Sequence, residues 1–281
     1  MIKINCPAEF LSIKDTLYCG QIFRFKPYKD GYLVNSLDKC AYCYNEDDRA
    51  VIECEETDLA YFFEFFDLNK DYSKIVSEAK EQGVEILSAA AENCKGIRIL
   101  KQNPLETLFS FIVSQNNNIP RIKGIIERLC AALGELRVFM GESYHAFPTA
   151  KKMAGKDENF YKDLGLGYRA EYVRRLAVDI VNGLDISEFS SLYTVDLKKR
   201  LLSIHGVGPK VADCVTLFGF NRSDSFPVDT WMEKVYREDF KGNLKDRNKI
   251  TEYFNNRFKE NAGYFQQYLF HYKRLSENNS K

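Results

Sequence analysis

The sequence contains few histidines and tryptophans, no surplus of charge and no long apolar run. Only three of its 281 residues are His and one is Trp, and 40 basic side chains balance 40 acidic ones. This balance argues against a protein that coats polyanions over its whole surface, although a local basic face still permits binding to DNA. No apolar stretch approaches the roughly 20 residues that cross a bilayer. We therefore expect no contact with a membrane.

The eight cysteines do not repeat the spacing of a zinc site. Cys40 and Cys43 form one Cys-x-x-Cys pair, with Cys19 and Cys54 as conceivable partners, but the sequence has no second such pair. The pair also falls in a strand-like stretch, whereas zinc ligands usually come from two matched pairs. We predict buried thiols and no metal site. The first residues lack the apolar core of a signal peptide, so we expect a reducing cytoplasmic setting.

The aromatic content is high, with 21 Phe and 17 Tyr in a chain that is 45% hydrophobic. Such a chain can bury a sizeable core. Short β-branched or aromatic runs separated by turn residues predict an antiparallel sheet in the first quarter of the chain. These runs lie at 22–25, 32–34, 41–44 and 51–54.

From Asp58 onward the spacing of apolar residues becomes helical. Asn103 is followed by Pro104 and, three residues after the cap, by Glu106, a pattern that starts a helix with a capping box. We predict an α+β fold in which an N-terminal antiparallel β-sheet lobe packs on a mostly helical body. Further helices are predicted near 171–183, 194–203, 209–218, 230–238, 247–258 and 262–275.

The most informative motif is a glycine turn between two of these helices. Gly206 and Gly208 permit a tight turn, and Pro209 suits the first position of the next helix. The free N–H groups of that helix, together with its dipole, form a site for a DNA phosphate. Lys210 lies in the first turn, where the positive end of the dipole favours the free amine that a Schiff-base nucleophile needs. Asp229 follows nineteen residues later at the start of another helix.

This segment resembles the helix-hairpin-helix motif and catalytic aspartate of the base-excision DNA glycosylase superfamily. The Lys-Val-Ala-Asp-Cys run from Lys210 and the Pro-Val-Asp ending at Asp229 resemble the 8-oxoguanine DNA glycosylase/AP lyases that carry a catalytic lysine. The last cysteine is Cys214, which excludes the C-terminal iron–sulfur loop of the endonuclease III branch. The resemblance implies three regions: a β-rich lobe at 1–95, a helical domain with the hairpin at 96–230, and C-terminal helices at 231–281.

The resemblance also implies how a damaged base would be held. Gly20, in a Gly-Gln-x-Phe-Arg segment, would offer its carbonyl to the N7–H of 8-oxoguanine, while guanine would present a lone pair there. An unpaired buried carbonyl costs about 1–3 kcal/mol, which would discriminate against guanine. The other expected pocket residues are Phe23, Cys214, Gln266 and Phe270.

Two loops resemble the family's DNA-contacting segments. Asn116 would fill the gap left by an extruded base, and Tyr168 would wedge into the stack. Arg121 and Arg169 would read a cytosine opposite the lesion. The hairpin glycines, Gly206 and Gly208, would lie against phosphate. Without the resemblance, Asn118 is also a candidate helix cap and Tyr168 a core or rim aromatic. One departure is Trp231, where eukaryotic members carry a histidine.

The expected activity is therefore a bifunctional glycosylase and lyase with Lys210 and Asp229 as catalytic residues. Its partner would be double-stranded DNA containing 8-oxoguanine, bound by a monomer in the cytoplasm on nucleoid DNA, with no cofactor. Two alternatives remain. A monofunctional glycosylase for alkylated purines would share the fold and Asp229 without needing Lys210, and a noncatalytic helix-hairpin-helix module would use only the hairpin.

Overall fold

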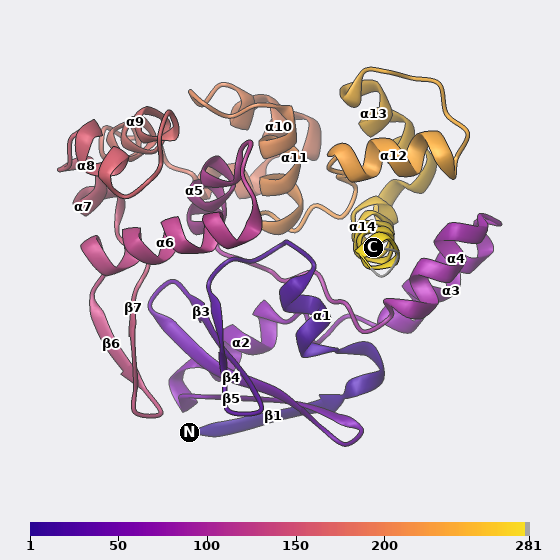
Figure 1. Cartoon of the computed structure of the whole chain (residues 1–281), viewed down its shortest axis with the longest axis horizontal. Coiled ribbons are helices and arrows are strands. Elements are labelled where there is room, and N and C mark those ends of the chain that lie inside the picture. Colours follow the sequence, from indigo (N-terminus) through magenta and orange to yellow (C-terminus); the bar gives the residue numbers. More distant parts are fainter. Residues whose placement is uncertain (279–281) are drawn as a thin grey trace. The chain divides into compact units, whose positions relative to one another are not determined.

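The computed structural model describes residues 1–278, and their contacts group into two compact units. The first unit comprises Met1–Ile22, Cys43–Lys101 and the chain from Asn221 onward. The second unit comprises Phe23–Tyr42 and Gln102–Phe220. Each unit is therefore assembled from separate segments of the chain, as the sequence colours of Figure 1 show. The three-region division stays a prediction.

Five strands form one sheet, in the hydrogen-bonded order β1-β5-β4-β3-β2. β1 pairs antiparallel with β5, with Ile2 opposite Cys54, and β2 pairs antiparallel with β3, with Phe25 opposite Val34. The antiparallel N-terminal sheet is thus confirmed. The expected run at 22–25 begins as a strand only at Phe25. The strands are β1 Ile2–Pro7, β2 Phe25–Tyr28, β3 Gly31–Ser36, β4 Lys39–Glu46 and β5 Arg49–Cys54.

Helices dominate the rest of the first unit. Phe226, in the loop before α12, stacks on Phe254 of α13 with ring centres 4.2 Å apart. This pair lies at the centre of an aromatic cluster that joins the loop to α13. In Figure 1, α14 lies beside α4 and α12. The helices of this unit are α1 Ile13–Tyr18, α2 Leu59–Phe65, α3 Tyr72–Glu81, α4 Glu85–Asn93, α12 Thr230–Glu238, α13 Arg247–Phe258 and α14 Ala262–Asn278.

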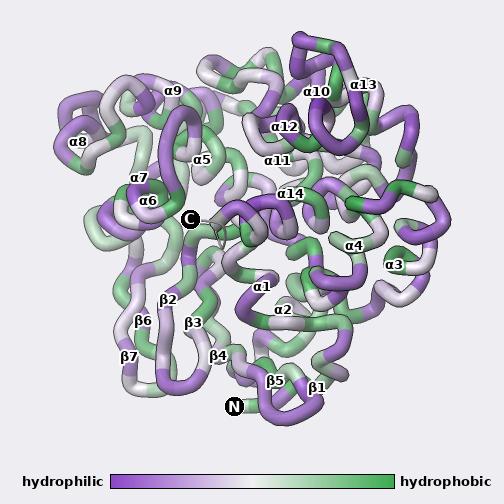
Figure 2. The backbone as a smooth tube through the Cα atoms, turned by 45° about the vertical axis from the view of Figure 1, so that its right-hand side comes forward, coloured by the Kyte–Doolittle hydropathy of each residue, from purple (hydrophilic) through white to green (hydrophobic). Residues whose placement is uncertain are grey.

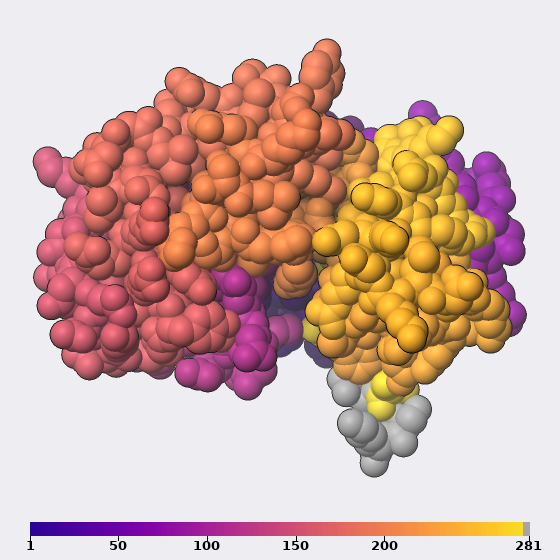
Figure 3. Space-filling view, turned by 90° about the horizontal axis from the view of Figure 1, so that it is seen from above, coloured from indigo at the N-terminus to yellow at the C-terminus, as the bar shows by residue number. Residues whose placement is uncertain are grey.

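The second unit is built around α5 (Pro104–Ser114), which is buried at every position from Glu106 to Ser114. A helix that is buried on all sides belongs in the middle of a bundle, and α5 contacts α6, α9 and α11. In Figure 3 the salmon to orange atoms of this unit form one continuous surface. The remaining elements are α6 Ile119–Leu133, β6 Leu136–Phe139, β7 Glu142–His145, α7 Ala150–Ala154, α8 Glu158–Asp163, α9 Arg169–Val181, α10 Thr194–Leu202 and α11 Pro209–Phe218.

A buried ion pair holds the start of β2 to α5. Arg24 Nη1 lies 3.1 Å from Glu106 Oε1, and the two side chains are 4% and 11% exposed. Glu106 also accepts a hydrogen bond from the Leu37 amide, and Arg24 donates to the carbonyl of His145. The cap at Asn103 is confirmed, since its side chain accepts from two amides of the first turn. The capping-box role of Glu106 is wrong, because its carboxylate is engaged by Arg24 and Leu37 instead.

The predicted later helices are confirmed, and α11, α12 and α13 match their expected bounds. The β6–β7 hairpin and β1 were not anticipated. No helix among the described residues is long and apolar enough to cross a membrane. Figure 2 accordingly shows hydrophobic and hydrophilic stretches alternating along the tube.

Candidate active site and DNA-binding elements

The hairpin turn between α10 and α11 uses its two glycines differently. Gly206 has a φ of +84°, and a Cβ placed there would lie 2.3 Å from Cγ of Tyr172. Its carbonyl accepts a hydrogen bond of 2.9 Å from Nε2 of Gln115. Gly208 is the N-cap of α11, and a Cβ there would meet nothing within 4 Å. Gly206 therefore fixes the turn against α9, while Gly208 leaves the free amides of α11 open to a ligand.

Lys210 lies in the first turn of α11, as predicted, and is half-buried. Its Nζ is 5.4 Å from the ring centre of Phe111 on α5. Phe23 packs edge-on against the same ring at 5.5 Å between centres. Cys214 is buried one turn after Lys210 on the same helix face. The second unit thus brings the predicted Lys210 and Phe23 to the ring of Phe111, and Cys214 follows Lys210 on α11.

A buried carboxylate beside Lys210 escaped the sequence analysis. Asp213 is 7% exposed, and its Oδ1 lies 2.8 Å from Nζ of Lys198 on α10. Burial raises the pKa of Asp213, while the charges of Lys198 and Lys210 oppose that shift. The ion pair ties the two helices of the hairpin together. The sequence did carry a signal for Asp213, because an acid three residues after Lys210 lies next to that lysine on one helix face.

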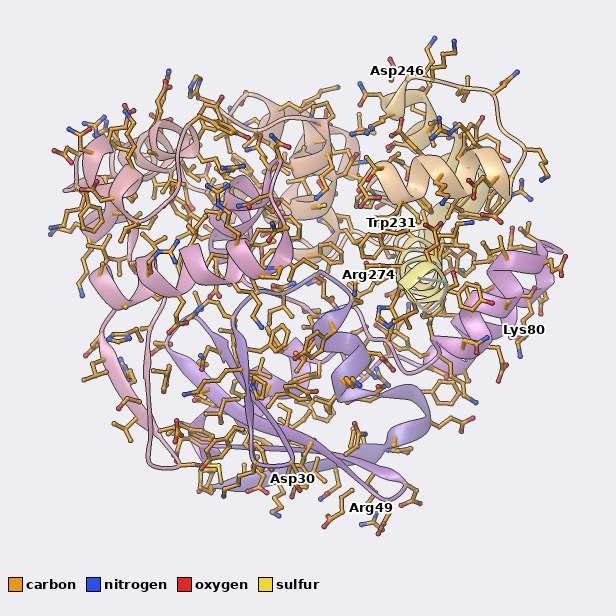
Figure 4. All side chains as sticks on the ribbon, in the orientation of Figure 1. Asp30, Arg49, Lys80, Trp231, Asp246 and Arg274 are labelled. Carbon is orange, nitrogen blue, oxygen red and sulfur yellow. The ribbon has the colours of Figure 1, made fainter. Side chains whose placement is uncertain are left out.

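Asp229 is the N-cap of α12. Its Oδ1 accepts hydrogen bonds from the amides of Trp231 at 2.9 Å and Met232 at 3.0 Å. These bonds fix the orientation of the carboxylate and bring it to the positive end of the helix dipole. Trp231 is partly exposed on the first turn of the same helix, where Figure 4 labels it. The cap is therefore real, and a catalytic role for Asp229 stays a prediction.

The predicted base-binding residues of the first unit lie along α14 and the turn after α1. Gly20 has a φ of +86°, and a Cβ there would lie 3.4 Å from Cε1 of Phe270. Gln266 is 5% exposed, and its Oε1 has no hydrogen-bond partner among residues 1–278. A buried amide oxygen without a donor is costly and marks a place where a ligand N–H can bind.

The Asn-Asn-Asn loop is held in a strained conformation. Asn116 has a φ of +45°, which is uncommon outside glycine. Asn118 caps α6 by accepting a hydrogen bond from the amide of Arg121, which confirms the cap. The Arg121 side chain reaches the carbonyl of Gly165 at 3.4 Å, and Tyr168 is 51% exposed. The loop therefore presents Asn116 from a defined backbone, next to an accessible ring.

Arg169 occupies a different environment from Arg121. It is 3% exposed and donates to the carbonyls of Gln115 at 2.8 Å, Asn116 at 2.9 Å and Leu166 at 3.2 Å. In this structure the guanidinium joins the Asn116 loop to the Tyr168 loop. To read a cytosine it would have to leave these carbonyls, so that role stays a prediction.

The cysteines are buried, except Cys6, which is partly exposed. All eight are free thiols, and burial raises the pKa of Cys19 to about 11 and that of Cys40 to about 12. No cluster of three or more potential metal ligands occurs among the described residues.

A helix-hairpin-helix turn, a lysine in the first turn of its second helix and an aspartate capping the next helix define a DNA glycosylase of the helix-hairpin-helix class. Residues 3–108 match the family described as the 8-oxoguanine DNA glycosylase N-terminal domain. Residues 109–260 match the HhH-GPD superfamily of base excision DNA repair proteins. The chain belongs to this superfamily, in its 8-oxoguanine glycosylase branch.

Individual relatives agree with that assignment. A "Probable N-glycosylase/DNA lyase" of Methanothermobacter thermautotrophicus is 31% identical over 232 residues, covering 75% of this chain and 73% of that protein. The structure of MBOgg1 with a low-affinity DNA ligand has a TM-score of 0.92 at 32% identity, covering 98% and 96% of the two chains. An 8-oxoguanine glycosylase/lyase of Clostridium acetobutylicum, bound to DNA with cytosine opposite 8-oxoguanine, has a TM-score of 0.90 at 34% identity, covering 96% and 93%.

Proposed function

We propose that this protein is a bifunctional base-excision repair enzyme that removes 8-oxoguanine from duplex DNA and then nicks the strand. One observation carries the proposal: a half-buried lysine amine stands over an aromatic ring in the first turn of the hairpin's second helix. The packing on Phe111 holds the amine in a defined place, which a nucleophile that attacks one carbon atom requires.

In the proposed reaction the Lys210 amine attacks C1′ of the flipped nucleotide. The C1′–N9 bond breaks, its electron pair leaves with the base, and the base takes up a proton. Asp229 stabilises the positive charge that develops on the sugar, since its carboxylate is held in place by the α12 amides. Loss of a proton from the amine and opening of the sugar ring give a Schiff base. Removal of a C2′ proton then expels the 3′ phosphate by β-elimination.

Base recognition would fall to the residues at Gly20 and α14. The unpartnered Oε1 of Gln266 would accept an N–H from the Watson–Crick edge of the base, and Phe270 would stack on its plane. The carbonyl of Gly20 would accept the N7–H that guanine lacks. Arg121 and Arg169 would favour cytosine as the opposite base. We further propose that the enzyme acts as a monomer in the cytoplasm.

The test uses duplexes with 8-oxoguanine opposite each of the four bases, with base release and strand nicking measured separately. Wild-type protein should release base and nick, most rapidly opposite cytosine. Lys210→Gln should lose both activities but still bind the duplex, and Asp229→Asn should slow base release by about 10²–10³-fold, the usual cost of removing one electrostatic stabiliser. Base release that survives in Lys210→Gln would favour the monofunctional alternative. Binding without base release in wild type would favour the noncatalytic module.

A further inference from the structure

Three successive carbonyls, those of Tyr18, Cys19 and Gly20, lie at the end of α1 and in the turn after it, and α14 engages two of them. The guanidinium of Arg274 donates to the carbonyl of Tyr18, and Nε2 of Gln267 donates to the carbonyl of Cys19 at 2.7 Å. The third carbonyl, that of Gly20, receives no hydrogen bond from any group within residues 1–278. Two of the three oxygens are therefore fixed by the protein, and the third is left for a ligand.

The same helix face also sets the position of Phe270. Gln267, Phe270 and Arg274 are spaced by three and four residues, which places them along one side of α14. Cζ of Arg274 lies 5.3 Å from the ring centre of Phe270, a cation–π contact. Nη1 of Arg274 is also 3.9 Å from the Cβ position of Gly20. Arg274 thus touches both the turn and the ring, and Figure 4 labels it beside α14.

We infer that Arg274 is a positioning residue for lesion recognition, assisted by Gln267: it holds the Tyr18–Gly20 turn and the Phe270 ring in the geometry that admits 8-oxoguanine. The inference rests on the proposed function. The lesion differs from guanine at N7 by one hydrogen-bond donor, so discrimination depends on where a single carbonyl oxygen points. A functional group has to be held within about 0.5 Å of its productive position to act this way.

A guanidinium performs this task better than an ammonium. Its planar fork can donate to the carbonyl of Tyr18 while its face stays against Phe270, whereas a lysine amine is a compact point charge on a flexible stem. The side chain is half-buried, so its removal should disturb the core less than removal of Gln267, which is 2% exposed. Arg274 is therefore the better position for a substitution.

Arg274 also lies near enough to Asp229 for their charges to interact. A charge effect on Asp229 would act on the sugar chemistry, while a positioning effect would act only when a base is present. Nicking at a preformed abasic site needs the catalytic lysine but no base recognition. The ratio of 8-oxoguanine excision to abasic-site nicking therefore separates the two explanations.

The experiment measures single-turnover excision of 8-oxoguanine opposite cytosine and nicking of an abasic site in the same duplex. The variants are Arg274→Ala, Arg274→Lys and, as a matched control, Arg257→Ala. Arg257 is also an arginine stacked on an aromatic ring of the first unit, over Phe240 at 5.2 Å, but it touches neither the turn nor Phe270.

Arg274→Ala should slow excision by about tenfold or more and leave abasic-site nicking within about twofold of wild type. Arg274→Lys should fall between, and Arg257→Ala should match wild type on both substrates. Equal rates for Arg274→Ala and wild type on both substrates would overturn the inference. So would an Arg274 variant that loses the same factor in excision and in abasic-site nicking while its melting temperature is unchanged. If Arg274→Ala fails to fold, Arg274→Lys decides by the same ratio. Wild-type protein that leaves 8-oxoguanine intact would refute the proposed function itself.

Discussion

The two glycines of the hairpin turn should separate folding from DNA binding when each is replaced by alanine. Gly206 lies in the left-handed region with a φ of +84°, and an alanine there costs about 1–2 kcal/mol from backbone strain alone. Its Cβ would also lie 2.3 Å from Tyr172, so this ring has to move and the contact between the turn and α9 is lost. Gly206→Ala should therefore lower the free energy of unfolding by about 2 kcal/mol or more.

Gly208→Ala meets neither obstacle. Its φ is −92°, and no atom lies within 4 Å of the added Cβ. The change should alter the free energy of unfolding by less than about 1 kcal/mol, the cost of a poorer N-cap. The methyl group would, however, stand where a phosphate approaches the free amides of α11. Gly208→Ala should therefore weaken binding to an abasic-site analogue in duplex DNA.

Urea unfolding followed by circular dichroism measures the first effect, and fluorescence anisotropy with a labelled duplex measures the second. We expect a loss of stability for Gly206→Ala only, and for Gly208→Ala a loss of DNA affinity with nearly unchanged stability. A Gly208→Ala protein that binds DNA as tightly as wild type would refute the role given to the α11 amides. A Gly206→Ala protein of wild-type stability would refute the packing of the turn on Tyr172.

Three further results are expected. Arg24→Met should lower the free energy of unfolding by about 3–5 kcal/mol in urea titrations, because the buried Glu106 loses its partner; a loss below 1 kcal/mol would contradict this. His271, whose Nε2 lies 3.5 Å from Oδ1 of Asp15, and the Ser12 hydroxyl both lower the pKa of Asp15. The contribution of Asp15 to stability is therefore present above about pH 4 and is lost as the pH falls through its folded pKa. The difference in free energy of unfolding between wild type and Asp15→Asn should shrink from pH 7 to pH 3. A difference that stays constant over this range would show a packing effect instead and contradict the expectation. In thiol titration of the native protein, Cys6 should react first, since the other seven cysteines are buried; several rapid thiols would refute that burial.

Local signals in the sequence were sufficient for most helix boundaries. Pro209 starts α11, and the capping side chains of Asn103 and Asp229 start α5 and α12, because each motif satisfies amides only a few residues away. The strand β1 was missed although its burial alternates around Ile4, since six residues are a weak signal without the partner strand. Short-range chemistry therefore predicted the elements better than their pairing.

Long-range partners could not be predicted in the same way. Glu106 fits a capping box, yet the buried guanidinium of Arg24, 82 residues away, engages it instead. Arg169 donates to the carbonyls of Gln115 and Asn116, more than 50 residues away, and its expected role at the opposite cytosine stays a prediction. The ring of Phe111 beside Lys210 was visible only in the fold. The partner of a buried charged side chain depends on the folded backbone, and the spacing of residues along the sequence does not reveal it.

Borohydride trapping tests the central claim most directly. Wild-type protein and Lys210→Gln are incubated with a duplex that carries 8-oxoguanine opposite cytosine, beside an undamaged duplex, and then reduced. We expect a covalent protein–DNA adduct with the lesion strand only, formed by wild type and absent from Lys210→Gln. An adduct of equal yield with Lys210→Gln, or base release by wild type without any adduct, would contradict it.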